Sequence, residues 1–364
     1  MIFDLAIIGG GPAGCAAAII AARNGARVVL LERGKLPRHR VCGEFVSAES
    51  LELLNDLLGS EFERLMLSAP QISQARVFAD GRVVQARIFP SAASISRFDL
   101  DAALWKACVA CGVEAPVQSA VRNLSGRGPF HLTANHEVFE ARAVINAGGR
   151  WSNFTSSTTR ACVTSEKWIG IKGHFIEEAG SDSVDLYFFD GGYCGVQPIE
   201  ICKSGFRRVN ACAMVRADVA STMGDILKQH KALHSRSQYW GAATDSVTTS
   251  PLIFHEPEPF QGIMLQAGDA AMFVDPFVGD GISLALRSGS LAAKSLLPFF
   301  RDKISLAHAG EAYSREYLRR FGRVFTNSSR LRSLMRWPQI IRKPVLSALA
   351  KAPIVTNQLV RMTR

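Results

Sequence analysis

The chain has 364 residues, of which 48% are hydrophobic and 20% charged. This size and composition are typical of a globular protein with two domains, or with one large domain that carries an insertion. The net charge of +10 is uneven: residues 314–364 contain 12 Lys or Arg and a single acid, Glu316, so the rest of the chain sums to about −1. This distribution argues against a nucleic-acid-binding protein.

The sequence also argues against several other classes of protein. No apolar run is long enough to cross a bilayer, and no basic segment precedes the apolar residues that begin at Ile2, so we expect no signal peptide. We therefore expect a cytoplasmic protein whose eight cysteines are reduced. The histidines form no metal-spaced cluster, and the Cys108-x-x-Cys111 pair has no second pair to complete a metal site, so we expect no metal. No serine has a nucleophile-elbow context, so we expect no hydrolase chemistry.

The first 33 residues predict a strand, a glycine turn, a helix and a second strand. Residues 4–8 and 27–31 are apolar strand patterns on either side of an Ala/Ile-rich helix. Glu32 directly follows the second strand, where a carboxylate can accept hydrogen bonds from ribose hydroxyls. This context, rather than the glycine spacing alone, predicts a dinucleotide site with its phosphates at the helix N-terminus.

Three glycines in the turn have separate roles. Gly9 makes the tight turn, and Gly11 lets the backbone approach a pyrophosphate. Gly14 lets the helix pack closely on the strands.

The next segments predict a loop, two helices and a hairpin. Residues 33–44 contain Gly and Pro and predict a loop that folds back over the cofactor. Ser47–Leu58 predicts an amphipathic helix with Ser47 as its N-cap. Residues 74–89, centred on Asp80-Gly81, predict a hairpin, and a helix from about Phe98 to Cys111 follows.

The pattern then changes to strands. Residues 113–146 predict short strands, and strand-like runs dominate 167–259, interrupted by a helical stretch at 220–235. We interpret 167–259 as a mostly antiparallel sheet inserted into the first domain. Residues 263–267 predict another buried strand, which leads through a glycine-rich turn into a helix from Ser283 to Leu297. The N-terminus of that helix is a second site for an anionic or electron-rich ring edge.

Three blocks of sequence resemble the glutathione-reductase-type flavoprotein fold. They are Gly9–Gly14 with Glu32, Ala147–Arg150, and Gly268-Asp269 followed by Pro276–Gly281. More narrowly, the chain resembles the p-hydroxybenzoate hydroxylase superfamily and, within it, the geranylgeranyl reductase family, whose cysteine loop is similar to Pro37–Glu44.

This resemblance implies an α/β fold. A glutathione-reductase-type FAD-binding Rossmann-like domain would carry an inserted, mostly antiparallel β-sheet substrate domain and C-terminal helices. The expected division is 1–74, 97–165 and 263–310 for the FAD-binding domain, 75–96 and 166–262 for the substrate domain, and 311–364 for a basic helical segment.

The resemblance also implies non-covalently bound FAD, with NADPH or another reductant as electron donor. Glu32 would hold the adenosine ribose, Arg97 would contact the cofactor, and Asp269 would bond the ribityl chain. The expected cofactor-binding residues are Gly9, Gly11, Pro12, Ala13, Gly14, Glu32, Arg33, Arg40, Cys42, Gly43, Arg97, Gly268, Asp269, Pro276, Gly279, Gly281 and Ile282.

Two departures from related families matter. Hydroxylases of this superfamily usually have Asp-Gly where this chain has Gly148-Gly149, which argues against direct reduction by NADPH. Flavin-dependent halogenases carry tryptophans in a segment of the inserted sheet, whereas Gly192–Pro198 has none, which ranks a halogenase low.

Four residues are candidate catalytic groups: Cys42, His39, Tyr193 and Asp280. Cys42 either lines the substrate side of the flavin or is a small buried hydrophobe. His39 lies in the same loop, where it can touch cofactor or substrate. Tyr193 either lines an apolar cavity or packs within the sheet, and Asp280 is either an acid/base group or a turn former.

We expect an FAD-dependent oxidoreductase that acts on an apolar isoprenoid, polyketide or aromatic substrate by hydride transfer at flavin N5. The alternatives are a flavin monooxygenase that hydroxylates a lipophilic aromatic through a C4a-hydroperoxide, and a non-enzymatic FAD-binding protein. The basic tail either packs on the body with arginines facing water or forms an amphipathic surface for an anionic membrane or an acidic carrier.

Overall fold

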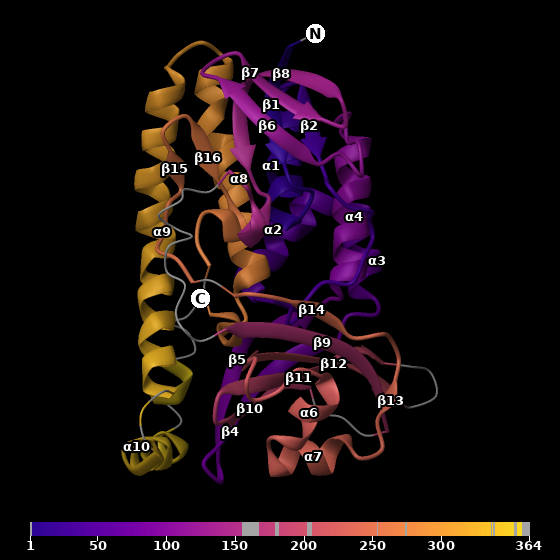
Figure 1. The fold of residues 1–364 in the computed structure, drawn as a ribbon, viewed down its shortest axis with the longest axis vertical. Helices are drawn as coiled ribbons and strands as arrows, with labels where there is room; N and C mark the ends of the chain where they lie inside the picture. Colours follow the sequence, from indigo (N-terminus) through magenta and orange to yellow (C-terminus); the bar gives the residue numbers. More distant parts are fainter. Residues whose placement is uncertain are drawn as a thin grey trace.

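The computed structural model describes residues 2–154, 167–178, 182–201, 206–252, 254–273, 275–335, 337, 339–352 and 355–358. The described strands form two sheets that lie at opposite ends of the molecule (Figure 1). The long helix α9 (Leu306–Met335) runs along one side, from the first sheet toward the second, and α10 (Gln339–Lys351) follows it (Figure 1).

The first sheet is mixed, because the pairs β15–β16, β6–β7 and β7–β8 are antiparallel. Its strand order is β15-β16-β8-β1-β2, with β7 also paired to β8 and β6 to β7. The pairs β1–β2, β1–β8 and β16–β8 are parallel. Its strands are β1 (Ile2–Ile8), β2 (Val28–Leu31), β6 (Val121–Gly126), β7 (Phe130–Ala134), β8 (Glu137–Asn146), β15 (Phe260–Gln261) and β16 (Met264–Gln266).

Alternation along β1 gives the first sheet two buried faces. Leu5 and Ile7 belong to the main core, whereas Ala6 and Ile8 pack with residues of β6 and β7 on the other side. Helices of the main core are α1 (Pro12–Arg23), α2 (Ala48–Leu58), α3 (Ser60–Met66), α4 (Arg97–Ala110), α8 (Gly281–Phe300) and α9. A Cβ at Gly289 of α8 would overlap the carbonyl oxygen of Ala13, so this glycine permits the close approach of α8 to α1.

The second sheet is antiparallel except where β10 runs parallel to β4. Its strand order is β13-β9-β12-β11-β10-β4-β5-β3, with β14 also paired to β9. Its strands are β3 (Phe45–Val46), β4 (Gln71–Ala79), β5 (Arg82–Ser94), β9 (Trp168–Glu177), β10 (Ser183–Phe189), β11 (Gly192–Ile201), β12 (Arg207–Arg216), β13 (Gly241–Ala242) and β14 (Val247–Thr249). Helices α6 (Met223–Lys228) and α7 (Lys231–Ser237) cover the face that points away from the first sheet (Figure 1).

The predicted fold class is confirmed, and so is the hairpin. Asp80 and Gly81 both have positive φ, at 50° and 72°, as a two-residue turn between β4 and β5 requires. None of the described helices combines the length and apolarity needed to cross a membrane. Cys162 and Cys202 lie outside the described residues, and the six described cysteines are free thiols.

Two local details differ from expectation. Ser47 is the N-cap residue of α2, as predicted, but its side chain makes no capping hydrogen bond; instead its Oγ donates to Asp280 Oδ1 at 3.0 Å and lies 2.8 Å from Ser283 Oγ. Helix α8 begins at Gly281 rather than Ser283, which brings the Gly281 and Ile282 amides into its first turn. Hydrogen bonds to residues far away in the sequence therefore replace the side-chain capping bond that a serine at this position usually makes.

A buried carboxylate holds the far face of the second sheet together. Asp185 is fully buried and accepts hydrogen bonds from Arg76 Nε at 2.6 Å, Arg236 Nη1 at 2.7 Å and Ser183 Oγ at 2.7 Å. Arg236 also pairs with Glu177 at 2.9 Å.

Replacing Asp185 should destabilise the protein strongly. Asp185→Ala leaves two guanidinium groups without their shared carboxylate, so we expect the free energy of unfolding to fall by about 3 kcal/mol. A thermal melt measures this change. Asp218→Ala is the matched control, because Asp218 pairs with Arg216 at the surface, and it should melt with the wild type. Equal melting temperatures for both variants would contradict the assignment.

Candidate functional site

A cavity of about 880 Å³ lies between the carboxyl ends of the parallel strands and the second sheet. This volume falls within the range of small-molecule sites. The glycine turn after β1, the 32–45 loop, the start of α8 and Val247–Thr249 of the second sheet all line it. The position corresponds to where open α/β sheets bind ligands, outside the carboxyl ends of their strands.

The glycine turn has the shape of a pyrophosphate site. Gly9 has a φ of +102°, and a Cβ at Gly14 would overlap the carbonyl oxygen of Gly9, so α1 can start there only with glycines at both positions. A Cβ at Gly11, in contrast, would meet no atom nearer than Arg97 Nη2, at 4.0 Å. The free amides of the first turn of α1 therefore adjoin open space, as an anion site requires.

Glu32 is 3% exposed and directly follows β2, beside this turn. Its Oε2 accepts from Gly10 N at 2.8 Å, and its Oε1 accepts from Gly34 N and Arg38 Nη2, both at 2.8 Å. Burial alone would raise the pKa of Glu32, but the two amides and the nearby arginines outweigh it and lower the pKa. The ionised carboxylate keeps further lone pairs for ribose hydroxyls.

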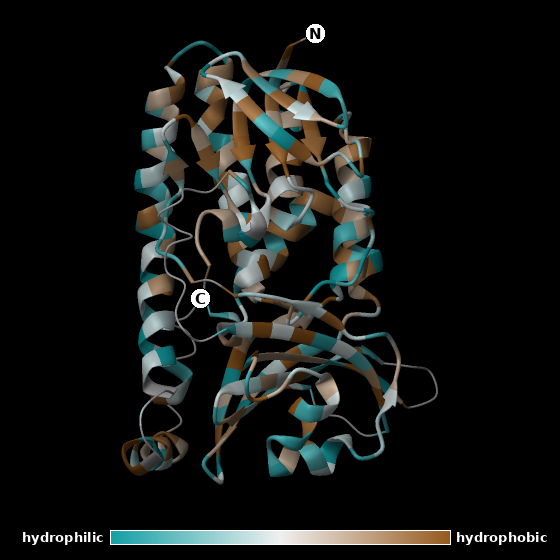
Figure 2. Ribbon diagram, in the orientation of Figure 1, coloured by the Kyte–Doolittle hydropathy of each residue, from teal (hydrophilic) through white to brown (hydrophobic). Residues whose placement is uncertain are grey.

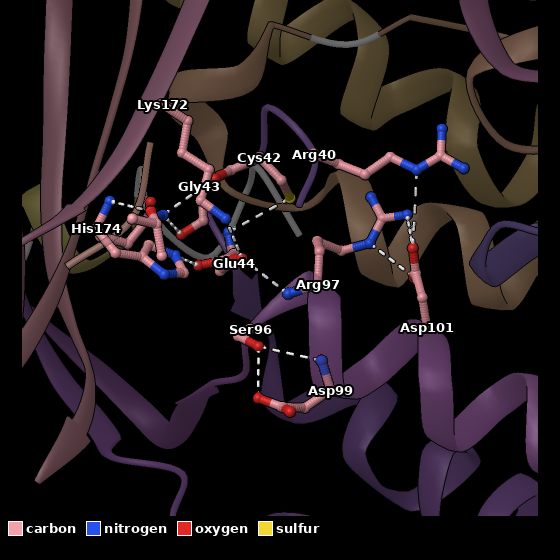
Figure 3. A network of polar contacts seen from close by, with 12 residues as sticks. Arg40, Cys42, Gly43, Glu44, Ser96, Arg97, Asp99, Asp101, Lys172 and His174 are labelled. Carbon is pink, nitrogen blue, oxygen red and sulfur yellow. Dashed lines mark hydrogen bonds and ion pairs between the residues drawn. The ribbon is translucent and has the colours of Figure 1, made fainter. Parts of the chain in front are cut away.

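Arg97 and Arg40 share a buried carboxylate that the sequence analysis did not single out. Arg97 donates from Nε and Nη2 to the two oxygens of Asp101, each at 2.9 Å, and Arg40 Nε lies 3.8 Å from the same carboxylate (Figure 3). Both arginines line the cavity, so Asp101 orients two cations toward the phosphate side. The i, i+4 spacing of Arg97 and Asp101 in α4 was the available signal.

Glu44 joins the loop to the second sheet. It is fully buried with a φ of 62°, and its Oε1 accepts hydrogen bonds from the Arg97 amide, at 2.8 Å, and from Lys172 Nζ (Figure 3). His174 Nε2 lies 2.8 Å from Oε2. Burial would raise the pKa of Glu44, but the His174 hydrogen bond and the Lys172 charge lower it.

Lys172 and His174 belong to a row of buried polar side chains across the second sheet, here called the polar seam: Lys172, His174, Asn210 and Gln197. His174 pairs in register with Asn210, and Asn210 with Gln197, so the seam crosses β9, β12 and β11 on one face. Asn210 Nδ2 donates to the carbonyl oxygens of Cys42, at 3.0 Å, and Gly43, at 2.9 Å. The seam therefore fixes the backbone of the cysteine loop.

Sequence reasoning missed the polar seam. Its signal was a lysine and a histidine two residues apart in an otherwise apolar strand, which places both on the same buried face.

Two of the four candidate catalytic residues, Cys42 and His39, line the cavity. Burial raises the pKa of the Cys42 thiol. Burial and the nearby charges of Lys172 and His174 lower the pKa of His39. At neutral pH the cavity wall therefore carries a protonated thiol and a neutral imidazole.

Tyr193 and Asp280 are not among the cavity-lining residues. Tyr193 is 5% exposed and packs against Phe188 and Phe277, with ring centroids 5.4 Å and 5.9 Å away, and burial raises its pKa well above the usual value. Tyr193 is thus a packing residue behind the cavity. Asp280 precedes the first turn of α8, and Ser47 Oγ donates a hydrogen bond to it.

Each expected cofactor-binding residue lines the cavity except Gly14, which packs behind the glycine turn.

Comparisons with known proteins agree with this geometry. A family model described as FAD dependent oxidoreductase matches residues 4–37. The chain is 26% identical to digeranylgeranylglycerophospholipid reductase 2 of Methanopyrus kandleri, covering 89% of this chain and 84% of that protein. It is 25% identical to menaquinone reductase of Mycobacterium tuberculosis, covering 93% and 85%.

Two solved structures share the fold. A geranylgeranyl bacteriochlorophyll reductase-like protein from Thermoplasma acidophilum has a TM-score of 0.78 at 18% identity, covering 100% of this chain and 95% of that one. The flavin-dependent brominase Bmp2 has a TM-score of 0.77 at 17% identity, covering 100% and 93%. At these identities the likeness concerns the fold alone.

A methyl group at Gly11 tests the pyrophosphate position. Gly11→Ala should leave the stability of the FAD-free chain unchanged, because the new Cβ meets no atom within 4.0 Å, yet weaken FAD binding at least about tenfold. Fluorescence titration with FAD measures the affinity. Gly224→Ala is the control. Gly224 lies in α6, next to the second sheet, and a Cβ there would also meet open space, with Thr222 Oγ1 as its nearest neighbour at 3.9 Å, so this variant should bind FAD normally. Normal FAD binding by Gly11→Ala would remove the pyrophosphate from this turn.

Asp280 should give the FAD-free chain a specific pH dependence. Burial raises its pKa to about 6, against the effect of the Ser47 hydrogen bond. An aspartate in the unfolded chain titrates near pH 4, so between about pH 4 and 6 folding is accompanied by uptake of a proton at Asp280. The contribution of Asp280 to stability is therefore fully present below about pH 4 and is lost as the pH rises through about 6.

Asp280→Asn should abolish this slope and raise the free energy of unfolding at pH 7.5 by about 2 kcal/mol. Urea denaturation at a series of pH values measures both effects. The exposed-site variant Asp218→Asn should keep the wild-type slope between pH 4 and 6. If Asp280→Asn also keeps it, the carboxyl group titrates normally in the folded chain.

Proposed function

We propose that the chain, which is similar to geranylgeranyl reductase-like FAD-dependent oxidoreductases, reduces, or introduces, a carbon–carbon double bond in an apolar substrate. The observation that carries the proposal is a single cavity with a phosphate-binding end and an apolar end, joined by the cysteine loop. FAD supplies the hydride-transfer chemistry when it is bound.

The chain's own residues fit the cofactor from end to end. The amides at the start of α1 and the cations Arg40 and Arg97 suit the pyrophosphate, and Glu32 suits the ribose. The first amides of α8, at Gly281 and Ile282, form the positive end of a second helix beside the cavity. That end stabilises the negative charge that a reduced flavin carries on its pyrimidine edge.

The apolar end supports a lipophilic substrate. Phe273 lines the cavity and belongs to a cluster with Tyr193, Met214 and Leu252. Phe254 stacks on Phe273 with ring centroids 5.1 Å apart. The names of two relatives refer to a digeranylgeranyl lipid and to menaquinone, which supports an isoprenoid chain as the substrate here.

Cys42 is the proposed proton donor. Reducing a double bond adds a hydride to one carbon and a proton to its neighbour, so the site needs a protonated group that faces the substrate. Cys42 lines the cavity in a loop that the polar seam fixes, and its raised pKa keeps the thiol protonated at neutral pH. His39 lines the same cavity as a neutral imidazole, which can relay a proton from water to the thiolate.

Hydride transfer is favoured over oxygen chemistry by two features of the chain. Gly148 stands where related hydroxylases usually have an acid, which favours a reductant other than NADPH as electron donor. The strand β11 contains no tryptophan, unlike the segment of the inserted sheet that flavin-dependent halogenases carry.

The proposal is tested by reducing the FAD-loaded protein anaerobically, with NADPH or dithionite, and then admitting air. We expect slow return of the oxidised flavin spectrum without a transient band, and poor reduction by NADPH. A transient band that appears on admitting air, or reduction that waits for a lipophilic aromatic, would replace the reductase with a monooxygenase. Failure to bind any flavin would end both proposals.

Removing the Cys42 thiol should slow substrate reduction selectively. With dithionite-reduced enzyme and an excess of a menaquinone or geranylgeranyl lipid, Cys42→Ala should lower the rate of flavin reoxidation about a hundredfold, the usual size of a lost general acid. Reduction by dithionite should be unaffected. Cys111→Ala, a partly buried thiol at the end of α4, should behave as wild type. An unchanged rate in Cys42→Ala would assign the proton to another group.

A further inference from the structure

Helix α10 presents apolar side chains outward. Ile340 is 83% exposed and Ile341 50% exposed, and Trp337 just before the helix is 44% exposed. Pro344 and Ala348 are also exposed and follow Ile340 at helical spacing. We call these five residues the terminal patch. An outward helix face is normally polar, so this one requires a partner.

The opposite face of α10 holds the helix firmly on the second sheet. Leu346 is 4% exposed and packs with Ala79 and Val84. Arg342 donates from Nε and Nη2 to the two oxygens of Asp80, at 2.6 Å and 2.7 Å. The helix is therefore fixed with the terminal patch on its outer side, and Figure 2 shows this helix, largely brown, at one end of the molecule.

Exposed cations accompany the terminal patch in the sequence. Lys343 and Lys351 are exposed on α10 itself, and Arg323 and Arg330 are exposed on the preceding helix. Residues 314–364 carry a net charge of +11, against about −1 for the rest of the chain. An apolar stripe with basic margins has the chemistry of a helix that lies in the headgroup layer of a membrane.

We propose that the terminal patch docks the protein on an anionic lipid surface. The apolar side chains enter the boundary between headgroups and acyl chains, and the flanking cations contact lipid phosphates. A lipid surface can contact both the apolar side chains and the cations, whereas an acidic protein would pair only with the cations.

The inner side of α10 also adjoins the apolar wall of the cavity. Phe188 of β10 packs with Leu346 and Leu349 of this helix, and its ring lies 5.9 Å from that of Phe277. Phe277 belongs to the cluster that includes the cavity-lining Phe273. If the proposed function holds, the docked helix brings the membrane next to the part of the protein that takes a lipophilic substrate.

Vesicle sedimentation tests the docking. The FAD-loaded full chain is mixed with vesicles of phosphatidylglycerol and phosphatidylcholine, or of phosphatidylcholine alone. We expect binding to the anionic vesicles only, weakening as salt is added. Ile340→Glu should lower the partition coefficient at least about tenfold, because it replaces an inserted apolar side chain by a charge. Lys343→Glu should weaken binding at low salt and make it less dependent on salt, because one cationic contact to lipid phosphates is lost.

Leu67→Glu is the matched control. Leu67 is 88% exposed at the end of α3, so its replacement adds the same charge at another site and should leave vesicle binding unchanged. Absence of binding, or equal binding by Ile340→Glu, would overturn the proposal. So would a dimer in size-exclusion chromatography that Ile340→Glu dissociates, because the patch would then contact a second copy. Since vesicle binding needs no turnover, its failure is separate from failure of the proposed reaction.

Discussion

The arrangement of the site depends on one buried carboxylate. Glu44 sits in a loop of the first domain with a positive φ, which is unfavourable for a residue with a Cβ, and its two oxygens face three donors. Lys172 and His174, which supply two of these donors, belong to the other sheet. A buried ion pair is a weak source of net stability but a strong source of geometry, because losing one partner leaves a charge unpaired. Glu44 therefore sets where the cysteine loop lies.

The cavity has a polar end and an apolar end, and the loop that Glu44 holds lies between them. On one side, Asp101 and Glu32 hold arginines and amides for phosphates and ribose. On the other, Phe273 of the segment before α8 lines the cavity and packs against aromatic residues of the second sheet that lie behind it. The loop between them carries Cys42, with Asn210 fixing its carbonyl oxygen. A flavin held by Glu32, Arg97 and the first amides of α8 would supply hydride-transfer chemistry beside Cys42.

The elements that sequence predicted are those that local chemistry determines. The Gly9–Gly14 turn and the Asp80-Gly81 hairpin have patterns that depend on backbone conformation and on spacing within a few residues. The alternating apolar and polar residues of the second-sheet strands, and the continuous apolar run of β1, likewise predicted the fold class.

The parts that sequence did not predict depend on partners far along the chain. Glu44 and His174 are 130 residues apart, and Ser47 and Asp280 are 233 residues apart, so no local pattern joins them. The sequence marked Cys42 and His39 but left Tyr193 between a cavity and a packing role. Only the register of β10 with β11 puts its ring against Phe188.

The most direct test of the whole account is the mass of the product formed from a lipophilic substrate. Turnover is carried out in deuterated water under isotopically heavy oxygen, and the product is examined by mass spectrometry. The account predicts a product that differs from its substrate by one pair of hydrogens, with deuterium where bonds are reduced and no heavy oxygen. A product that contains one atom of heavy oxygen would contradict it and identify the chain as a monooxygenase.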